Sequence, residues 1–161
     1  MKPKVIAIAA AVLVLAFAIY WIFNGDSEQD LIAKRLDQLV ETLETSAGGG
    51  QLKALTGANK ASSFFTEDCV VEAPNVRMNV DGSDALTGAF AQALNLCETV
   101  KIQLTKRDIT LSQDSESATM NLRSSFSVTA SGQKESGSGE YQLEWTKYQG
   151  KWYIQSVLLL R

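Results

Sequence analysis

The sequence predicts an α+β domain that follows an N-terminal transmembrane helix. Three observations support this prediction. An uncharged apolar run occupies residues 5–23, amphipathic helical segments follow it, and the second half of the chain alternates between apolar and polar residues as β-strands do. Because helices come before a run of strands, the pattern favours α+β with a mostly antiparallel sheet. We divide the chain into a cytoplasmic start and transmembrane anchor, residues 1–24, and one domain, residues 25–161.

The predicted anchor runs from Val5 to Phe23 and contains no charged residue. As a helix rising about 1.5 Å per residue it would extend roughly 28 Å, close to the apolar thickness of a bilayer. Lys2 and Lys4 precede the run and acidic residues follow it, so we expect a single pass through the inner (cytoplasmic) membrane, with the domain in the periplasm or outside the cell. A signal peptide cleaved after Ala18 is the alternative, although the apolar run continues beyond that residue.

The first helix of the domain is expected from Ser27 to about Ser46. Ser27 is a suitable N-cap, and acidic residues occupy the first turn. A second helix is expected over residues 51–65, after a glycine triplet that ends the first. The expected inward faces of the two helices are Ile32, Leu36, Leu39, Val40 and Leu43, then Leu52, Leu55, Ala58, Ala61 and Phe64 or Phe65.

Two short strands, residues 68–72 and 76–80, are expected on either side of a turn that contains Pro74. A third helix follows and continues to about Leu96, with Asp81 or Ser83 as its N-cap. Its predicted apolar side consists of Ala85, Leu86, Ala89, Phe90, Ala93, Leu94 and Leu96.

The remainder of the chain predicts four long antiparallel strands. In the first of them the apolar residues change parity, which indicates a bulge near residues 106–108. We expect residues 131–139 to form a flexible polar hairpin loop and Gln149-Gly150 to form a tight turn. The four strands are expected over residues 100–111, 118–129, 141–146 and 152–160.

Composition excludes several functions. Without Lys2 and Lys4 the chain has 13 basic against 18 acidic residues, a net charge of −5, which argues against nucleic acid as a partner. There is no histidine, so histidine-dependent catalysis and most zinc sites are ruled out. We therefore predict no metal and no cofactor.

The two cysteines, Cys69 and Cys97, leave two alternatives open. An even number of cysteines in an oxidising compartment is compatible with a disulfide. Free cysteines are also common as small buried apolar residues. A Cys69–Cys97 disulfide is therefore one of two predictions for this pair.

Three segments resemble the nuclear transport factor 2-like superfamily, also called SnoaL-like or cystatin-like cone folds. They are FFTEDCVVEAP at 64–74, DGSDALTGAFAQAL at 81–94 and YQGKWYIQSVLL at 148–159. The chain looks like a membrane-anchored bacterial member of this superfamily. The resemblance covers residues 27–161 and implies three helices packed on a curved sheet, with a pocket between them. It carries over no catalytic residue, because none of the three segments is a catalytic motif.

If the pocket exists, its candidate lining residues are Phe64, Asp68, Glu72, Tyr141 and Trp145. A buried carboxylate among them would acquire a raised pKa and could act as a base. Solvated loop positions for the acids and core positions for the aromatic residues are the simpler interpretation.

Two functions remain. The first is an anchored extracytoplasmic binding or assembly module that docks a protein partner or a small apolar ligand without catalysis. In this case the outer face of the sheet, rich in Ser, Thr and Gln, is the expected surface for a partner or for a homodimer. The alternative is a cone-fold enzyme of the isomerase or dehydratase type that uses a buried carboxylate base. A tether that holds the domain close to the bilayer favours binding.

Overall fold

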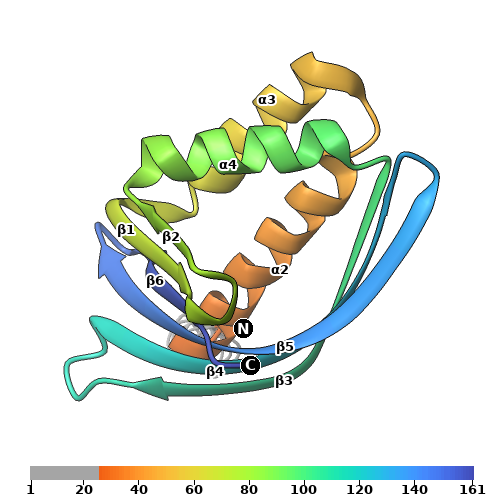
Figure 1. The fold of residues 1–161 in the computed structure, drawn as a ribbon. Helices are drawn as coiled ribbons and strands as arrows, with labels where there is room; N and C mark the ends of the chain where they lie inside the picture. Colours follow the sequence, from red (N-terminus) through yellow and green to blue (C-terminus); the bar gives the residue numbers. More distant parts are fainter. Residues whose placement is uncertain (1–25) are drawn as a thin grey trace, which may run out of the picture.

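The structure, a computed structural model, describes residues 26–161 and confirms the α+β class (Figure 1). Three helices lie over one side of a curved six-stranded sheet. No helix within residues 26–161 is long and apolar enough to cross a membrane, and the predicted anchor lies outside the described residues. The elements are α2 (Glu28–Ser46), α3 (Gly50–Ser62), β1 (Phe65–Ala73), η1 (Pro74–Val76), β2 (Met78–Asp81), α4 (Ser83–Leu96), β3 (Thr99–Leu111), β4 (Ser117–Ala130), β5 (Gln133–Tyr148) and β6 (Lys151–Leu159).

Helix α2 has the predicted start and the predicted buried face. The Ser27 hydroxyl accepts the Asp30 backbone N–H at 3.1 Å, and the Asp30 carboxylate accepts the Ser27 N–H at 3.2 Å. This reciprocal capping box satisfies two N–H groups that the helix leaves unpaired. Ile32, Leu36 and Leu39 are buried against the sheet.

Helix α3 buries only part of the predicted face: Ala58 and Ala61 are buried as predicted, but the two leucines are not. Leu52 and Leu55 are 79% and 49% exposed, and the helix ends at Ser62, before the Phe64-Phe65 pair. The buried residues of α3 are all small, and at Gly57 even a Cβ atom would overlap the side chain of Ser46 on α2. Close packing of α3 against both α2 and α4 therefore favours small residues at the contact rather than leucines: Ala54, Gly57, Ala58 and Ala61.

The predicted cap of α4 is wrong. Its N-cap is Gly82 with φ of 86°, a left-handed conformation that favours glycine, and no side chain caps the helix. The Gly82 N–H instead donates to the Cys69 carbonyl oxygen at 2.8 Å, which fixes the start of α4 on β1. Only Leu86 and Leu94 of the predicted apolar side are buried, and the others are partly or fully exposed.

The sheet has the strand order β2-β1-β6-β5-β4-β3. The β1–β6 pair is parallel and the other neighbouring pairs are antiparallel. A register shift between Leu104 and Lys106 confirms the bulge predicted in β3, slightly earlier in the chain. The bulge and the long bent strands β3, β4 and β5 curve the sheet around α2 (Figure 1).

The predicted loop over residues 131–139 is wrong, because residues 133–139 belong to strand β5 and pair with β4. The turn itself is only Ser131-Gly132. The glycines that suggested a loop serve a packing role in the strand. A Cβ atom at Gly137 would lie 2.8 Å from the Phe126 ring, and one at Gly139 would lie 2.8 Å from the Tyr141 hydroxyl. Glycine thus leaves room for an aromatic ring to lie on the strand.

The two cysteines are free. Cys69 lies next to the start of α4 through its bond to Gly82, whereas Cys97 caps the other end of the same helix. A helix of this length extends about 20 Å, and a disulfide requires Cα atoms within about 7 Å. The fold therefore holds them apart and the Cys69–Cys97 disulfide does not form. Burial raises the pKa of the Cys69 thiol, which makes it less reactive.

Candidate functional site

An apolar cavity of about 360 Å³ lies between the helices and the inner face of the sheet. Helix α2 and helix α4 form one side, and five strands form the other. The lining residues are Leu36, Leu39, Val40, Leu43, Phe65, Val71, Leu86, Phe90, Ile102, Leu104, Leu122, Ser124, Tyr141, Leu143, Ile154 and Val157.

The strand register explains why these side chains meet. Leu122 and Ser124 on β4 alternate with polar residues, and Tyr141 is paired with Leu122 across β4 and β5. Leu143 is in turn paired with Val157 on β6. Because alternate residues of a strand point to the same face, these positions form adjacent rows on the inner surface. On the helical side, Phe90 of α4 packs its ring 5.9 Å from that of Phe65.

The chemistry of the cavity wall is almost entirely apolar. Its polar side-chain groups are the hydroxyls of Ser124, which is buried, and Tyr141, which is half-buried. No carboxylate, ammonium or guanidinium group belongs to the described lining. Placing an unpaired charge in such a wall is costly, whereas apolar surface is favourable there. Residues 26–161 also contain no group of three acidic or cysteine side chains that could hold a metal ion.

Tyr141 lines the cavity, but the structure places the other four sequence candidates elsewhere. Phe64 is buried outside the cavity, under the guanidinium of Arg35. Trp145 is 1% exposed and fills the core beyond the cavity wall. Asp68 and Glu72 are exposed on β1.

Strand alternation places Asp68 outward, because its parity is opposite to that of the buried Cys69 and of Val71 in the cavity wall, but β1 also contains an irregularity before Val70. Phe65 pairs with Ile154 and Val70 pairs with Ser156, so four residues of β1 lie opposite a single residue of β6. This bulge interrupts the alternation at Glu67, which is exposed although it has the parity of the buried Phe65 and Cys69.

Ser124 is the polar residue that the sequence analysis missed. It has the same parity on β4 as Leu122 and Phe126, which would have indicated an inward hydroxyl within an apolar row. Its neighbours in sequence are also serine and arginine, and this polar context concealed the signal.

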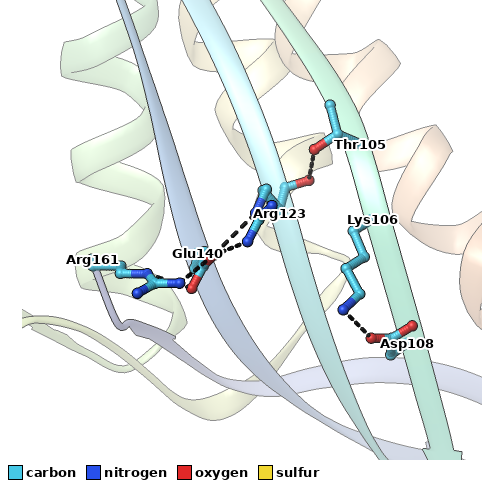
Figure 2. A network of polar contacts seen from close by, with 6 residues as sticks. All are labelled: Thr105, Lys106, Asp108, Arg123, Glu140 and Arg161. Carbon is cyan, nitrogen blue, oxygen red and sulfur yellow. Dashed lines mark hydrogen bonds and ion pairs between the residues drawn. The ribbon is translucent and has the colours of Figure 1, made fainter.

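The outer face of the sheet carries a separate polar network (Figure 2). The Glu140 carboxylate accepts the Arg161 Nη2 group at 2.8 Å and the Arg123 Nε group at 3.0 Å. Figure 2 shows the two arginines on either side of the acid. The Arg161 and Arg123 guanidinium groups lower the pKa of Glu140 to about 2. Two guanidinium groups thus share one carboxylate, and the network joins β4, β5 and the chain end after β6.

Three helices over a curved sheet, with an apolar cavity between them, define the cone-shaped class of α+β domains. A family model described as SnoaL-like domain matches residues 57–157. The chain therefore belongs to the SnoaL-like domain family, and the resemblance inferred from the three sequence segments is confirmed at this level. A search of functionally curated proteins found no significant match.

Solved structures share this fold at low sequence identity. A nuclear transport factor 2-like superfamily protein from Salmonella enterica has 13% identity and a TM-score of 0.66, with 82% of this chain and 89% of that chain covered. A proposed scytalone dehydratase from Novosphingobium aromaticivorans has 17% identity and a TM-score of 0.69, with 82% of each chain covered. A proposed association domain of calcium/calmodulin-dependent protein kinase II from Xanthomonas campestris has 20% identity and a TM-score of 0.67, with 84% and 89% covered.

Proposed function

We propose that this chain is a membrane-anchored extracytoplasmic binding module whose cone takes up a small apolar ligand without catalysing a reaction. The observation that carries this proposal is the cavity of about 360 Å³ with its nearly uniform apolar wall. Apolar pockets with a few polar groups are typical of small-molecule binding sites. The Ser124 and Tyr141 hydroxyls would orient one polar atom of such a ligand.

Binding is better supported than catalysis by the placement of the ionisable groups. A dehydratase or isomerase that uses a carboxylate base needs that base within reach of the substrate. The two acids considered from the sequence, Asp68 and Glu72, are on the solvent side of β1. The relative proposed to be a scytalone dehydratase shares the fold, but function depends on the site.

The proposal is tested by filling the cavity. In full-length protein in detergent, with labelled Leu and Val methyl groups, indole should cause saturable NMR shifts of Leu104 and Leu122. Val157→Phe adds a ring at a half-buried lining position, so it should weaken indole binding by about tenfold or more.

Val76→Phe is the matched control, because Val76 is 68% exposed and outside the cavity wall. This variant should bind indole like the original protein. Equal affinity of V157F, V76F and the original protein, or shifts confined to surface methyl groups, would contradict binding inside the cone.

A further inference from the structure

Arg35, a half-buried residue of α2 outside the cavity wall, is held in one orientation by three contacts. Its Nε–H group donates to the Trp152 carbonyl oxygen at 3.2 Å. The guanidinium carbon lies 4.3 Å from the centre of the Phe64 ring and 5.6 Å from that of Tyr153. Such contacts fix the plane of the guanidinium and remove much of the flexibility of the side chain.

Within residues 26–161 this fixed cation has no carboxylate partner. The other arginine that touches α2, Arg107, is paired with Asp37 at 2.9 Å, but no ion pair involves Arg35. Its Nε–H is used by Trp152, whereas neither Nη group makes a hydrogen bond to a described residue. The edge formed by the two Nη groups therefore keeps its donors available, and this edge matches the two oxygens of a carboxylate.

Arg35 lines a groove of about 440 Å³ between α2 and the end of α3. The charged side chains in the lining are Arg35, Lys60 and Glu41, which gives the groove a net charge of +1. The hydroxyl protons of Thr42, Thr45 and Ser63 are used by backbone carbonyl oxygens, so the hydroxyls do not add free donors. The full lining is Arg35, Gln38, Glu41, Thr42, Thr45, Lys60, Ser63 and Phe64.

The charge balance selects the kind of anion. A net charge of +1 can be neutralised by one negative charge, and the C-terminal end of α3 at the groove disfavours further negative charge. A planar, singly charged carboxylate satisfies both conditions and fits the bidentate edge of Arg35. Phosphate, which approaches two negative charges at neutral pH, fits less well.

We propose that Arg35, assisted by Lys60, binds the carboxylate of a small organic acid in the α2–α3 groove. This site is separate from the apolar cavity, because the two linings share no residue and use different sides of α2. The proposal therefore goes beyond the binding function of the cone and does not depend on it.

The test follows the Arg35 side chain directly. In full-length protein in detergent, labelled with ¹⁵N-arginine, sodium acetate replaces sodium chloride at constant ionic strength while the Nε–Hε signals are recorded. We expect a saturable shift of the Arg35 signal and none for Arg107, whose guanidinium is already paired. Neutral acetamide of the same shape should cause no saturable shift, and inorganic phosphate should bind more weakly than acetate.

Variants separate binding from structure. Arg35→Lys keeps the charge but loses the bidentate edge, so it should lower acetate affinity about tenfold. Lys60 is exposed, and Lys60→Gln leaves the Arg35 contacts intact, so this variant should lower acetate affinity by a smaller factor. Arg107→Gln is the matched control and should leave acetate affinity unchanged. Absence of saturation at Arg35 in the original protein, or tighter binding of phosphate than of acetate, would overturn the assignment.

Discussion

At the scale of single residues, Glu28 joins the first turn of α2 to the hairpin of β5 and β6. Its carboxylate accepts Lys147 Nζ and Trp152 Nε1, each at 2.8 Å. The bond from Lys147 and then the bond from Trp152 lower the pKa of Glu28. One side chain thus satisfies a buried indole N–H and orients the helix that forms one wall of the cavity.

Replacing Glu28 should therefore weaken the fold. Glu28→Gln removes the charge but keeps the size of the side chain. We expect a loss of about 1–2 kcal/mol in the free energy of unfolding, because hydrogen bonds to charged groups are stronger than those between neutral groups. Thermal unfolding of the full chain in detergent, followed by circular dichroism, measures this. Glu41→Gln on the exposed face of the same helix makes none of these contacts and should melt like the original protein. Equal losses in both variants would contradict the assigned role.

The residue scale also shows where the sequence was sufficient and where it was not. The inward position of Tyr141 follows from strand alternation alone, since Leu143 and Trp145 share its parity. The outward position of Asp68 agrees with the solvated position that the sequence favoured, but the bulge at Glu67 could not be derived, because β1 forms it only against β6. Arg35 carries no sequence signal either, since Phe64 and Tyr153 reach it from distant parts of the chain.

At the scale of elements, the contact of α3 with α2 depends on the absence of a side chain at Gly57. A Cβ atom there would overlap Ser46, which belongs to the last turn of α2. Ser46 has little freedom to move, because it is buried and donates to the Thr42 carbonyl oxygen. We expect Gly57→Ala to lower the free energy of unfolding by about 1–3 kcal/mol, the usual cost of overpacking.

Gly88 on α4 is the matched control for this prediction. It is also a glycine within a helix, but it is exposed, and a Cβ atom there meets no atom within 4 Å. Gly88→Ala should therefore stabilise the protein by about 0.5–1 kcal/mol through helix propensity. Melting curves of the two variants should shift in opposite directions, and a stabilised G57A protein would refute close packing of α3.

The Glu140 network makes the attachment of the chain end to β4 and β5 depend on pH (Figure 2). The two arginines lower the pKa of Glu140 from 4.5 to about 2. The stability that the ionised Glu140 contributes is therefore complete above about pH 4.5 and is lost as the pH falls towards 2. At neutral pH, Glu140→Gln should melt at a lower temperature than the original protein. The difference should shrink between pH 4.5 and 2. A difference in melting temperature that stays constant across this range would contradict a stabilising role for the ionised form of Glu140.

At this scale the sequence predicted the order and type of the elements but not every function of their residues. Period and capping residues were enough for α2, and a change of parity was enough for the bulge in β3. The inward positions predicted for Leu52 and Leu55 are wrong, because helix α3 packs at a distance that only small residues allow. Gly137 and Gly139 suggested a loop, but they leave space in the strand for Phe126 and Tyr141. This role depends on neighbours that only the strand register defines.

At the scale of the whole molecule, the cavity and the Arg35 groove lie on different sides of α2, and the start of that helix indicates how the domain would face a membrane. Glu28 holds the start of α2 at the hairpin turn of β5 and β6, Gln149-Gly150. The turn at Ser131-Gly132 lies at the other end of β5 (Figure 1). Sixteen residues of β5 separate the two turns, an extended length of up to about 50 Å.

If residues 5–23 anchor the chain in a bilayer, the Gln149 turn should lie near the lipid surface and the Gly132 turn far from it. A fluorophore attached through Gln149→Cys or Gly132→Cys, each in a Cys97→Ser background, reports this in liposomes that carry a head-group quencher; Cys69 is fully buried and does not compete for the label. We expect strong quenching at position 149 and weak quenching at position 132, because quenching requires close contact with the lipid surface. Equal quenching at both positions would contradict the proposed orientation. Loss of the liposome-bound protein after removal of residues 1–24 would identify the apolar run as the anchor, whereas retention would assign membrane binding to the domain itself.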